Sequence, residues 1–280
     1  MSYMPAEQKR RPSVLLSLPS YGNPCPGSVR AAYQYAARNV HLHTAETTAS
    51  LLAHGFNSAW CAALTAMEDG TQLDYFSMLH SDVEPVPPSR PDEPYWLNVL
   101  IDELERTKAD VLSCVVPIKD PRGVVSTAVA GDTPWNPLFR LTMQQVMMLP
   151  ETFSAADLGH PDRALLVNTG CWIARAGKWM YDFPGFTIND RLVRTQVATP
   201  EGVKAVWRPE VEPEDWFASR WFANRGMKVL ATRKVKVNHV GVMRYGNDGG
   251  WGELAFDRDL DAAAAEALTH RLTTRGAEAA

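Results

Sequence analysis

A mostly apolar run that ends in a polar cluster constrains this chain more than any other segment. Residues 73–79 have the length of a strand, and the triplet His80-Ser81-Asp82 follows directly, just before Pro85. Proline lacks a backbone donor and restricts the residue before it, so a buried strand cannot continue through this region. The sequence therefore predicts a buried strand whose exposed end carries His80 and Asp82.

The spacing of His80 and Asp82 suits the binding of a single cation. Residues two apart on an extended backbone project to the same side, and imidazole and carboxylate groups are common metal ligands. In open α/β sheets, ligands bind in the crevice at this end of the strands. An ordinary strand that ends in a polar turn is the structural alternative.

Bulk composition is that of an ordinary globular protein. The chain has 280 residues, 45% hydrophobic and 21% charged, which suffices for one large domain or two small ones. No apolar run approaches the ~20 residues of a membrane span, and the polar N-terminus lacks the apolar stretch of a signal peptide. We therefore expect a cytoplasmic protein without membrane contact. The four cysteines include no Cys-x-x-Cys pair, which favours reduced thiols.

The charge balance argues against non-specific nucleic-acid binding. The formal net charge is −4 at pH 7, whereas such binding depends on neutralising phosphates. A local basic group is nevertheless present in one segment, which contains Arg191, Arg194, Lys204 and Arg208.

Strand and helix patterns alternate along the first half of the chain. Strands are expected at 13–18, 73–79 and 110–117, and helices at 28–39, 50–68 and 95–108. This alternation favours a mixed, mainly parallel sheet flanked by helices. Residues 124–129 are expected to form a hairpin partner of 110–117, while 131–161 show no clear periodicity. We expect a flexible segment at 1–12, a single α/β domain at 13–255 and a C-terminal helix or tail at 256–280.

A second group of polar residues lies in a helical pattern at 211–226. Glu214 and Asp215 fall near its start, where acids stabilise the helix dipole by ~0.3–1 kcal/mol each. Strands are expected at 227–232 and 234–238, and His239 follows the second one. A dipole role for the acids and a structural role for His239 are the alternatives to a functional site.

The order of these segments, from Ser13 to Gly241, resembles that of nucleotide-sugar glycosyltransferases with the GT-A (Rossmann-like) fold, of the family 2-like type in bacteria and phages. In that family an Asp-x-Asp motif binds a divalent cation that bridges the donor diphosphate. The resemblance gives this role to Asp82, with His80 in place of the usual first Asp. A histidine after the last strands completes the metal site in many members, which implies His239. Oxygen and nitrogen ligands of this kind suit Mn²⁺ or Mg²⁺.

The resemblance also implies where a donor would bind. In GT-A enzymes the loop after the first strand holds the nucleotide base, a helix residue faces the donor, and a turn lines the sugar and acceptor pocket. Together with the metal motif, the matching positions are Pro19, Ser20, Tyr21, Asn57, His80, Ser81, Asn168, Thr169 and Gly170. A turn aromatic at Tyr21, an exposed helix residue at Asn57 and a tight bend at Gly170 are the alternatives.

A glycine-rich loop at 244–252 contains Trp251. Such a loop can fold over a bound donor, with Trp251 stacking on the sugar or the base. A flexible exit loop is the alternative.

The acidic pair of the helix at 211–226 supplies the candidate general base. GT-A glycosyltransferases carry such a pair just before an aromatic residue, and in inverting members one of the two is the base. Adjacent helix residues project ~100° apart, so both cannot address one acceptor hydroxyl. We expect Asp215, next to Trp216, to act as the base, with Glu214 as the second candidate.

The resemblance predicts metal-dependent transfer of a sugar, hexosyl or N-acetylhexosaminyl, from a nucleoside diphosphate sugar to a hydroxyl acceptor. UDP-sugars are the favoured donors, and the acceptor is left open among a glycan, a small molecule, a protein or a modified DNA base. A nucleotidyltransferase is the nearest alternative, but the loop at Pro19-Ser20-Tyr21-Gly22 lacks the lysine of a phosphate loop. A non-catalytic nucleotide-sugar-binding module is the alternative from another class.

Overall fold

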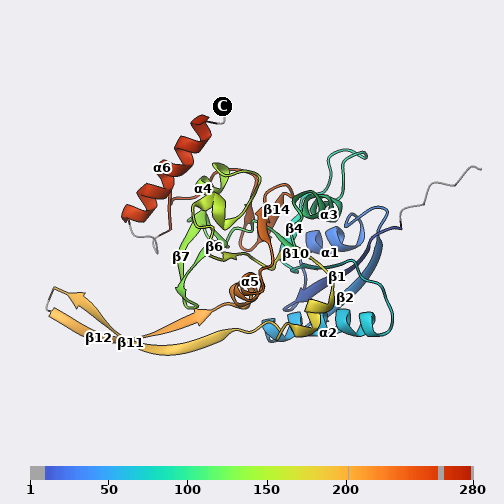
Figure 1. Cartoon of the computed structure of the whole chain (residues 1–280), viewed down its shortest axis with the longest axis horizontal. Helices are drawn as coiled ribbons and strands as arrows, with labels where there is room; N and C mark the ends of the chain where they lie inside the picture. The colour runs from blue at the N-terminus through green and yellow to red at the C-terminus, as the bar shows by residue number, and fades with distance from the viewer. Residues whose placement is uncertain (1–9, 201, 258–261, 279–280) are drawn as a thin grey trace, which may run out of the picture.

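A mixed α/β sheet of seven strands forms the centre of the molecule (Figure 1). The computed structural model describes residues 10–200, 202–257 and 262–278. In spatial order the strands are β2 (His41–Thr48), β1 (Ser13–Ser20), β3 (Tyr75–Leu79), β10 (Cys171–Arg175), β5 (Val111–Cys114), β13 (Val229–Thr232) and β8 (Thr152–Phe153). Only β10 and β8 run against the others, so the sheet is mostly parallel, as the sequence predicts.

Helices cover both faces of this sheet, because neighbouring residues of each buried strand point to opposite sides. On one face, Leu16 and Ile173 pack with α1 (Pro26–Tyr33) and α3 (Trp96–Thr107). On the other face, Phe76 and Trp172 pack with α2 (Leu52–Glu68) and α5 (Glu214–Asn224). The sheet is therefore the middle layer of three.

Smaller elements surround the sheet. One three-stranded sheet contains β15 (Arg244–Gly246), β14 (Val237–Val240) and β4 (Val83–Pro85), and another contains β7 (Asn136–Thr142), β6 (Val124–Thr133) and β9 (Leu165–Leu166). The remaining short helices are α4 (Met143–Met147) and the 3₁₀ helices at Ala155–Leu158 and Lys178–Asp182. The C-terminal helix α6 (Ala262–Glu278) buries Leu268 and Leu272 in the core. Strands β11 (Asn189–Thr199) and β12 (Gly202–Glu212) form a long hairpin, called the arm below.

The start of the chain differs from the expectation. Pro19 and Ser20 belong to β1 and pair with β2, instead of forming a loop. Proline is tolerated there because the pairing of β1 with β3 ends at Ser17, so the missing donor faces no strand partner. Strand β2 lies at the sheet edge and has a polar sequence, so the apolar pattern used to predict strands did not detect it. Residues 1–9 of the expected flexible segment lie outside the described residues, and Arg10 is ion-paired with Asp74 at 2.6 Å.

The hairpin expected between 110–117 and 124–129 forms only near its turn, where Pro117 bridges Val125 and the N–H groups of Ile118 and Ser126 donate to Val124 and Val116, while β6 otherwise pairs with β7 and β9. Two further expectations need correction. The first helix ends at Tyr33, well before residue 39. His239 lies inside β14, opposite Val83 of β4, instead of following the strand.

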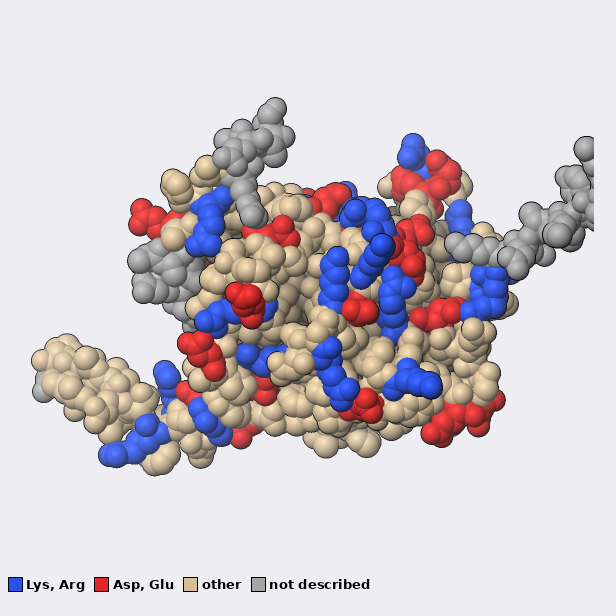
Figure 2. Space-filling view, viewed as in Figure 1, with Lys and Arg blue, Asp and Glu red and all other residues tan. Residues whose placement is uncertain are grey.

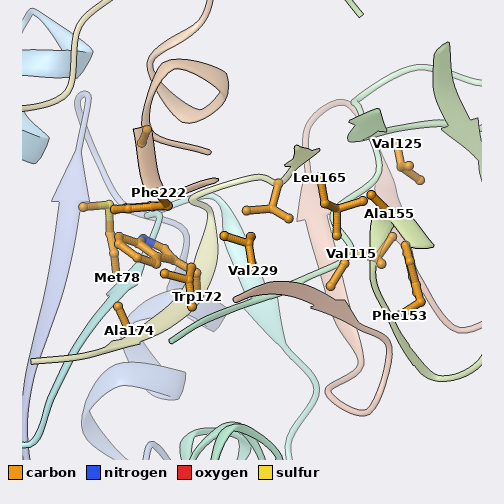
Figure 3. Close-up of a cluster of buried hydrophobic side chains, with 14 of the residues drawn as sticks. Met78, Val115, Val125, Phe153, Ala155, Leu165, Trp172, Ala174, Phe222 and Val229 are labelled. Carbon is orange, nitrogen blue, oxygen red and sulfur yellow. The ribbon is translucent and has the colours of Figure 1, made fainter. Parts of the chain in front are cut away.

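The core on the α2 and α5 face is rich in aromatic side chains (Figure 3). Trp172 of β10 lies 6.0 Å from Phe222 of α5 and 5.8 Å from Phe76 of β3, measured between ring centroids. Met78 and Ala174 lie beside this pair in Figure 3. On the opposite face, Cys114 and Cys171 face each other from β5 and β10, with their Sγ atoms 3.4 Å apart.

Phe222→Ala should therefore destabilise the chain strongly. Phe222 is 1% exposed, and removal of a fully buried phenyl ring leaves a cavity that costs ~3–5 kcal/mol. Phe222→Leu keeps most of the volume and should cost less than ~1.5 kcal/mol. Urea unfolding of the two variants checks this, and equal losses would show that the α5 face is not closely packed.

Candidate functional site

The His80-Ser81-Asp82 segment connects β3 to β4 at a point where several elements meet. The backbone N–H of His80 donates to the carbonyl of Gly170, at the start of β10, at 2.7 Å. The N–H of Ser81 donates to the carbonyl of Pro19 at 3.2 Å, and its carbonyl accepts from Cys25 before α1. These hydrogen bonds fix the segment at the carboxyl ends of β1 and β3, where the sequence places it.

Asp82 and His239 face each other across this end of the sheet. His239 Nε2 lies 3.6 Å from Asp82 Oδ2, and His239 Nδ1 lies 2.7 Å from the carbonyl of Pro117. Since a carbonyl only accepts, Nδ1 carries the proton and Nε2 is directed at the carboxylate. The backbone N–H of Val240 also donates to the carbonyl of Asp82, so strand β14 holds both residues in place.

Lys119 is a third member of this group, and its ammonium contacts the Asp82 carboxylate. Burial alone would raise the pKa of Asp82, but its contacts with His239 and Lys119 outweigh burial and hold that pKa well below its usual range. Asp82 is therefore an anion at every physiological pH. Lys119 lies on the loop after β5, and nothing in its local sequence marked it.

His80 lies beside this group in a more apolar setting. Its ring packs against Phe56 of α2 with 4.7 Å between centroids, and Nε2 is 3.4 Å from the Thr169 hydroxyl. Burial lowers the pKa of His80 to about 4, and the nearby Asp82 opposes this only in part. His80 is thus neutral near pH 7.

The turn Asn168-Thr169-Gly170 links this group to the acidic helix start. Thr169 contacts His80, while Asn168 Nδ2 donates to Asp215 Oδ2 at 3.2 Å. Asn168 Oδ1 accepts from the Gly170 N–H at 2.6 Å. A Cβ on Gly170 would lie 2.5 Å from Asn168 Oδ1 and 3.0 Å from a methyl of Val83, so only glycine fits there. The bend predicted at Gly170 and the predicted site residues Asn168 and Thr169 therefore belong to the same turn.

Glu214 and Asp215 are both buried at the start of α5, with 8% and 7% of their surface exposed. Burial raises the pKa of Asp215 to about 8, and the negative charge of Glu214 adds to the effect. Burial also raises the pKa of Glu214. Acids that served only the helix dipole would be solvated, so burial favours a role within the site.

Ser20, Tyr21 and Trp251, which are also predicted site residues, have surroundings of their own. Tyr21 is 73% exposed, and the Ser20 hydroxyl donates to the Gly22 carbonyl at 2.5 Å. Trp251 packs on Tyr245 and donates from Nε1 to the Gly246 carbonyl at 2.7 Å. It lines a pocket of about 420 Å³ with residues of the glycine-rich loop.

Asn57 is turned away from the group. Both ends of its amide bind the backbone of Phe186, with Nδ2 donating to the carbonyl at 2.9 Å and Oδ1 accepting from the N–H at 2.7 Å. Its neighbour Phe56 contacts His80 instead.

Basic side chains gather over the middle of the face that carries β4 and β14 (Figure 2). Arg244 donates to the buried Glu84 at 2.8 Å, and Arg30 lies 3.9 Å from the same carboxylate. With Lys119 on Asp82, three cations face two carboxylates. The local charge is therefore positive, which suits an anionic ligand.

The residues present fit a divalent cation held by few protein ligands. Among the described residues, no group of three or more His, Cys, Asp or Glu side chains is arranged to hold a metal. Asp82 and His239 nevertheless direct an oxygen and a nitrogen at one point, which already attracts the Lys119 cation. Magnesium commonly uses one or two carboxylates and completes its shell with water and substrate phosphates.

Comparison with known proteins gives no family. No family model and no curated protein matches the chain. Among solved structures, that of A197 from STIV has a TM-score of 0.48 at 13% identity, covering 88% of this chain and 97% of that one. UDP-glucose pyrophosphorylase complexed with UDP-glucose has a TM-score of 0.35 at 8% identity, covering 94% and 99%. TM-scores below 0.5 do not establish a shared fold, so neither similarity bears on function.

No helix in the described ranges is both long enough and apolar enough to cross a membrane.

The contacts of Asn57 predict a structural effect of its removal. Asn57→Ala should lower the free energy of unfolding by ~1–3 kcal/mol, because the N–H and carbonyl of Phe186 lose their partners. Ser58→Ala, on the next position of the same helix, is the matched control and should cost less than ~0.5 kcal/mol. Equal losses in the two variants would show that these two hydrogen bonds contribute little to stability.

Proposed function

We propose that this chain transfers a sugar from a nucleoside diphosphate sugar, with UDP-sugars favoured, to a hydroxyl acceptor. One observation carries the proposal: the Asn168–Gly170 turn contacts His80 through Thr169 and the buried Asp215 through Asn168, and Asp82, two residues after His80, lies 3.6 Å from His239. Such a site provides a place for an anionic leaving group and, next to it, a base. The order of these parts along the chain resembles that of GT-A glycosyltransferases, which supports the proposal.

The leaving diphosphate would bind where the local charge is positive. Lys119 and Arg244 are both partly exposed and close to Asp82 and Glu84, so phosphate oxygens can compete for them. Asp82 and His239 would hold Mn²⁺ or Mg²⁺, which neutralises charge on the departing diphosphate. With a cation on Asp82, Lys119 would have to leave that carboxylate, and its ammonium would then be available to the diphosphate.

Asp215 would accept the proton of the acceptor hydroxyl. As this oxygen forms its bond to the anomeric carbon, the bond from that carbon to the diphosphate breaks, and the hydroxyl proton passes to the Asp215 carboxylate. A pKa raised to about 8 makes Asp215 a stronger base than an ordinary aspartate. The Asn168 amide donates to Oδ2 and thereby fixes the carboxyl orientation.

Removal of the charged side chains at and around Asp82 tests the leaving-group site. Asp82→Ala should abolish the Mn²⁺ dependence of donor binding in titration calorimetry, whereas His80→Ala should have a smaller effect. Lys119→Met should strengthen Mn²⁺ binding, because it removes the competing cation, and should reduce turnover. Arg90→Met, an exposed cation on a distant loop, is the control. Donor affinity that depends equally on Mn²⁺ in Asp82→Ala would exclude this carboxylate as a ligand.

Neutralisation of the acidic pair tests the base. Asp215→Asn should reduce turnover by ~10²–10⁴ with nearly unchanged donor affinity. Glu214→Gln should have a smaller effect on turnover. Because the base must lose its proton, wild-type kcat/KM should rise as pH increases toward about 8, and Asp215→Asn should lack this rise. If both variants keep full turnover, the diphosphate itself takes the proton, and NMR of the product anomer should show retention.

The raised pKa of Asp215 predicts the opposite pH dependence for stability. The folded chain keeps a proton on Asp215 that the unfolded chain releases near pH 4, so the contribution of Asp215 to the wild-type free energy of unfolding should fall as pH rises toward about 8. Asp215→Asn should lack this contribution. Donor binding without any nucleoside diphosphate release from a panel of donors would indicate a binding module instead of an enzyme.

A further inference from the structure

A cavity of about 380 Å³ lies where the base of the arm meets β7 and the start of α5, three elements that lie side by side in Figure 1. Its wall includes Trp135 and Arg140 from β7 and the turn before it, Arg208 and Glu210 from the arm, and Trp216 from α5. We call it the arm-base cavity. Its volume falls within the roughly 300–1,000 Å³ of small-molecule sites, which typically combine aromatic walls with a few charged groups.

The arm-base cavity adjoins the candidate base. Trp216 follows Asp215 directly, and its backbone N–H donates to Asp215 Oδ1 at 2.8 Å. Pro213, which precedes the acidic pair, also lines the cavity. Burial and the charge of Glu214 raise the pKa of Asp215, whereas the positive charge of Arg140 opposes this rise, so Arg140 is close enough to act on that carboxyl group. A molecule in the cavity would therefore lie beside the group that takes the hydroxyl proton.

Arg140 directs a cation without hydrogen-bond partners at this cavity. Its Nε is buried and has no partner among the described residues. The Asp257 carboxylate lies 3.9 Å from this atom, which is too far for a hydrogen bond. The guanidinium is held over the Trp216 ring, with 4.9 Å between its central carbon and the ring centroid. Because a guanidinium carries five N–H donors and no acceptor, an oxyanion in the cavity would supply the partners that the chain does not.

The other charges of the arm-base cavity also favour an anion. Among the described residues of its wall, Arg140, Arg208 and Glu210 are charged, which gives a net charge of +1. Glu210 accepts from Arg191 at 2.7 Å and from Arg208 only at 3.5 Å, so Arg208 is the more weakly held of the two cations. Arg191 and Asp257, each in contact with a residue of the wall, add one charge of each sign. Figure 2 shows basic side chains where the arm joins the body.

We propose that the arm-base cavity binds the acceptor of the reaction, and that this acceptor is a small hydroxyl compound with a phosphate or carboxylate group. The inference rests on the proposed function, whose acceptor it narrows. Arg140 and Arg208 would bind the anionic group, because a guanidinium matches the oxygens of either anion with two parallel hydrogen bonds. The hydroxyl group would reach Asp215, since Trp216 borders both the cavity and that carboxyl group.

Titration calorimetry without any donor tests this binding, with glucose 6-phosphate, glucuronate and glucose as probes. Wild type should bind the two anionic sugars at least ~10-fold more tightly than glucose, which lacks the charge. The first two probes also show whether phosphate or carboxylate is preferred. Arg140→Gln and Arg208→Gln should each weaken the binding of the preferred anionic probe at least ~10-fold. Arg194→Gln, which removes the same charge from the arm outside the cavity wall, is the matched control and should leave it unchanged.

Lys119→Met shows where the probes bind. Anionic sugars in the arm-base cavity should bind this variant as tightly as wild type. Binding that is lost in Lys119→Met but kept in Arg140→Gln and Arg208→Gln would place the probes at Asp82 and overturn the proposal, as would equal affinity for all three probes. Because the Arg208 side chain is 56% exposed, Arg208→Gln keeps the test decisive if Arg140→Gln does not fold.

Nucleoside diphosphate release from a panel of donors separates this inference from the proposed function. Release that only neutral acceptors stimulate would overturn the inference and leave the proposed function standing. Binding of anionic sugars that depends on Arg140, in a chain that releases no nucleoside diphosphate, would support the anion site and count against the proposed reaction.

Discussion

The side chain and carbonyl of Asn168 connect the parts on which the candidate site depends. Its Nδ2 donates to Asp215, its Oδ1 accepts from Gly170, and its carbonyl accepts from the Ser113 hydroxyl of β5 at 2.5 Å. A single residue thereby ties the central sheet, the turn before β10 and the start of α5. Since these hydrogen bonds are at least partly buried, the loss of any one leaves a polar group without water to replace its partner.

The surroundings of Asp82 and Asp215 shift the pKa values of these two carboxyl groups in opposite directions. Asp82 lies among cations, which keep it ionised, whereas Asp215 lies in a buried setting next to another acid, which favours its protonated form. When the surroundings separate the pKa values of two titratable groups in this way, the two groups usually have different chemical roles. Here the ionised Asp82 suits the binding of a positive charge, and Asp215 suits the exchange of a proton.

The sequence predicted the layered α/β sheet because its strands are apolar and end at glycine, proline or polar residues. The glycosyltransferase resemblance assigned His80, Asp82, Asn168, Asp215 and His239 to one site, and the structure places Asp82 near His239 and Asn168 on Asp215. The sequence did not reveal Lys119, whose approach to Asp82 depends on a loop path, or the polar edge strand β2. It gave no hint of the arm, because a ribbon exposed on both faces lacks the alternation that a half-buried sheet produces.

The facing thiols of Cys114 and Cys171 have a consequence for the redox chemistry of the chain. Their Sγ atoms touch without a bond, and burial raises the pKa of the Cys171 thiol well above its usual range. Because oxidants and alkylating reagents attack the thiolate, both thiols are protected while the fold is intact. Cys61 on α2, in contrast, is exposed. Alkylation therefore distinguishes the two groups of thiols: modification that leaves Cys114 and Cys171 untouched reports an intact sheet, and modification of either one reports that β5 and β10 have separated.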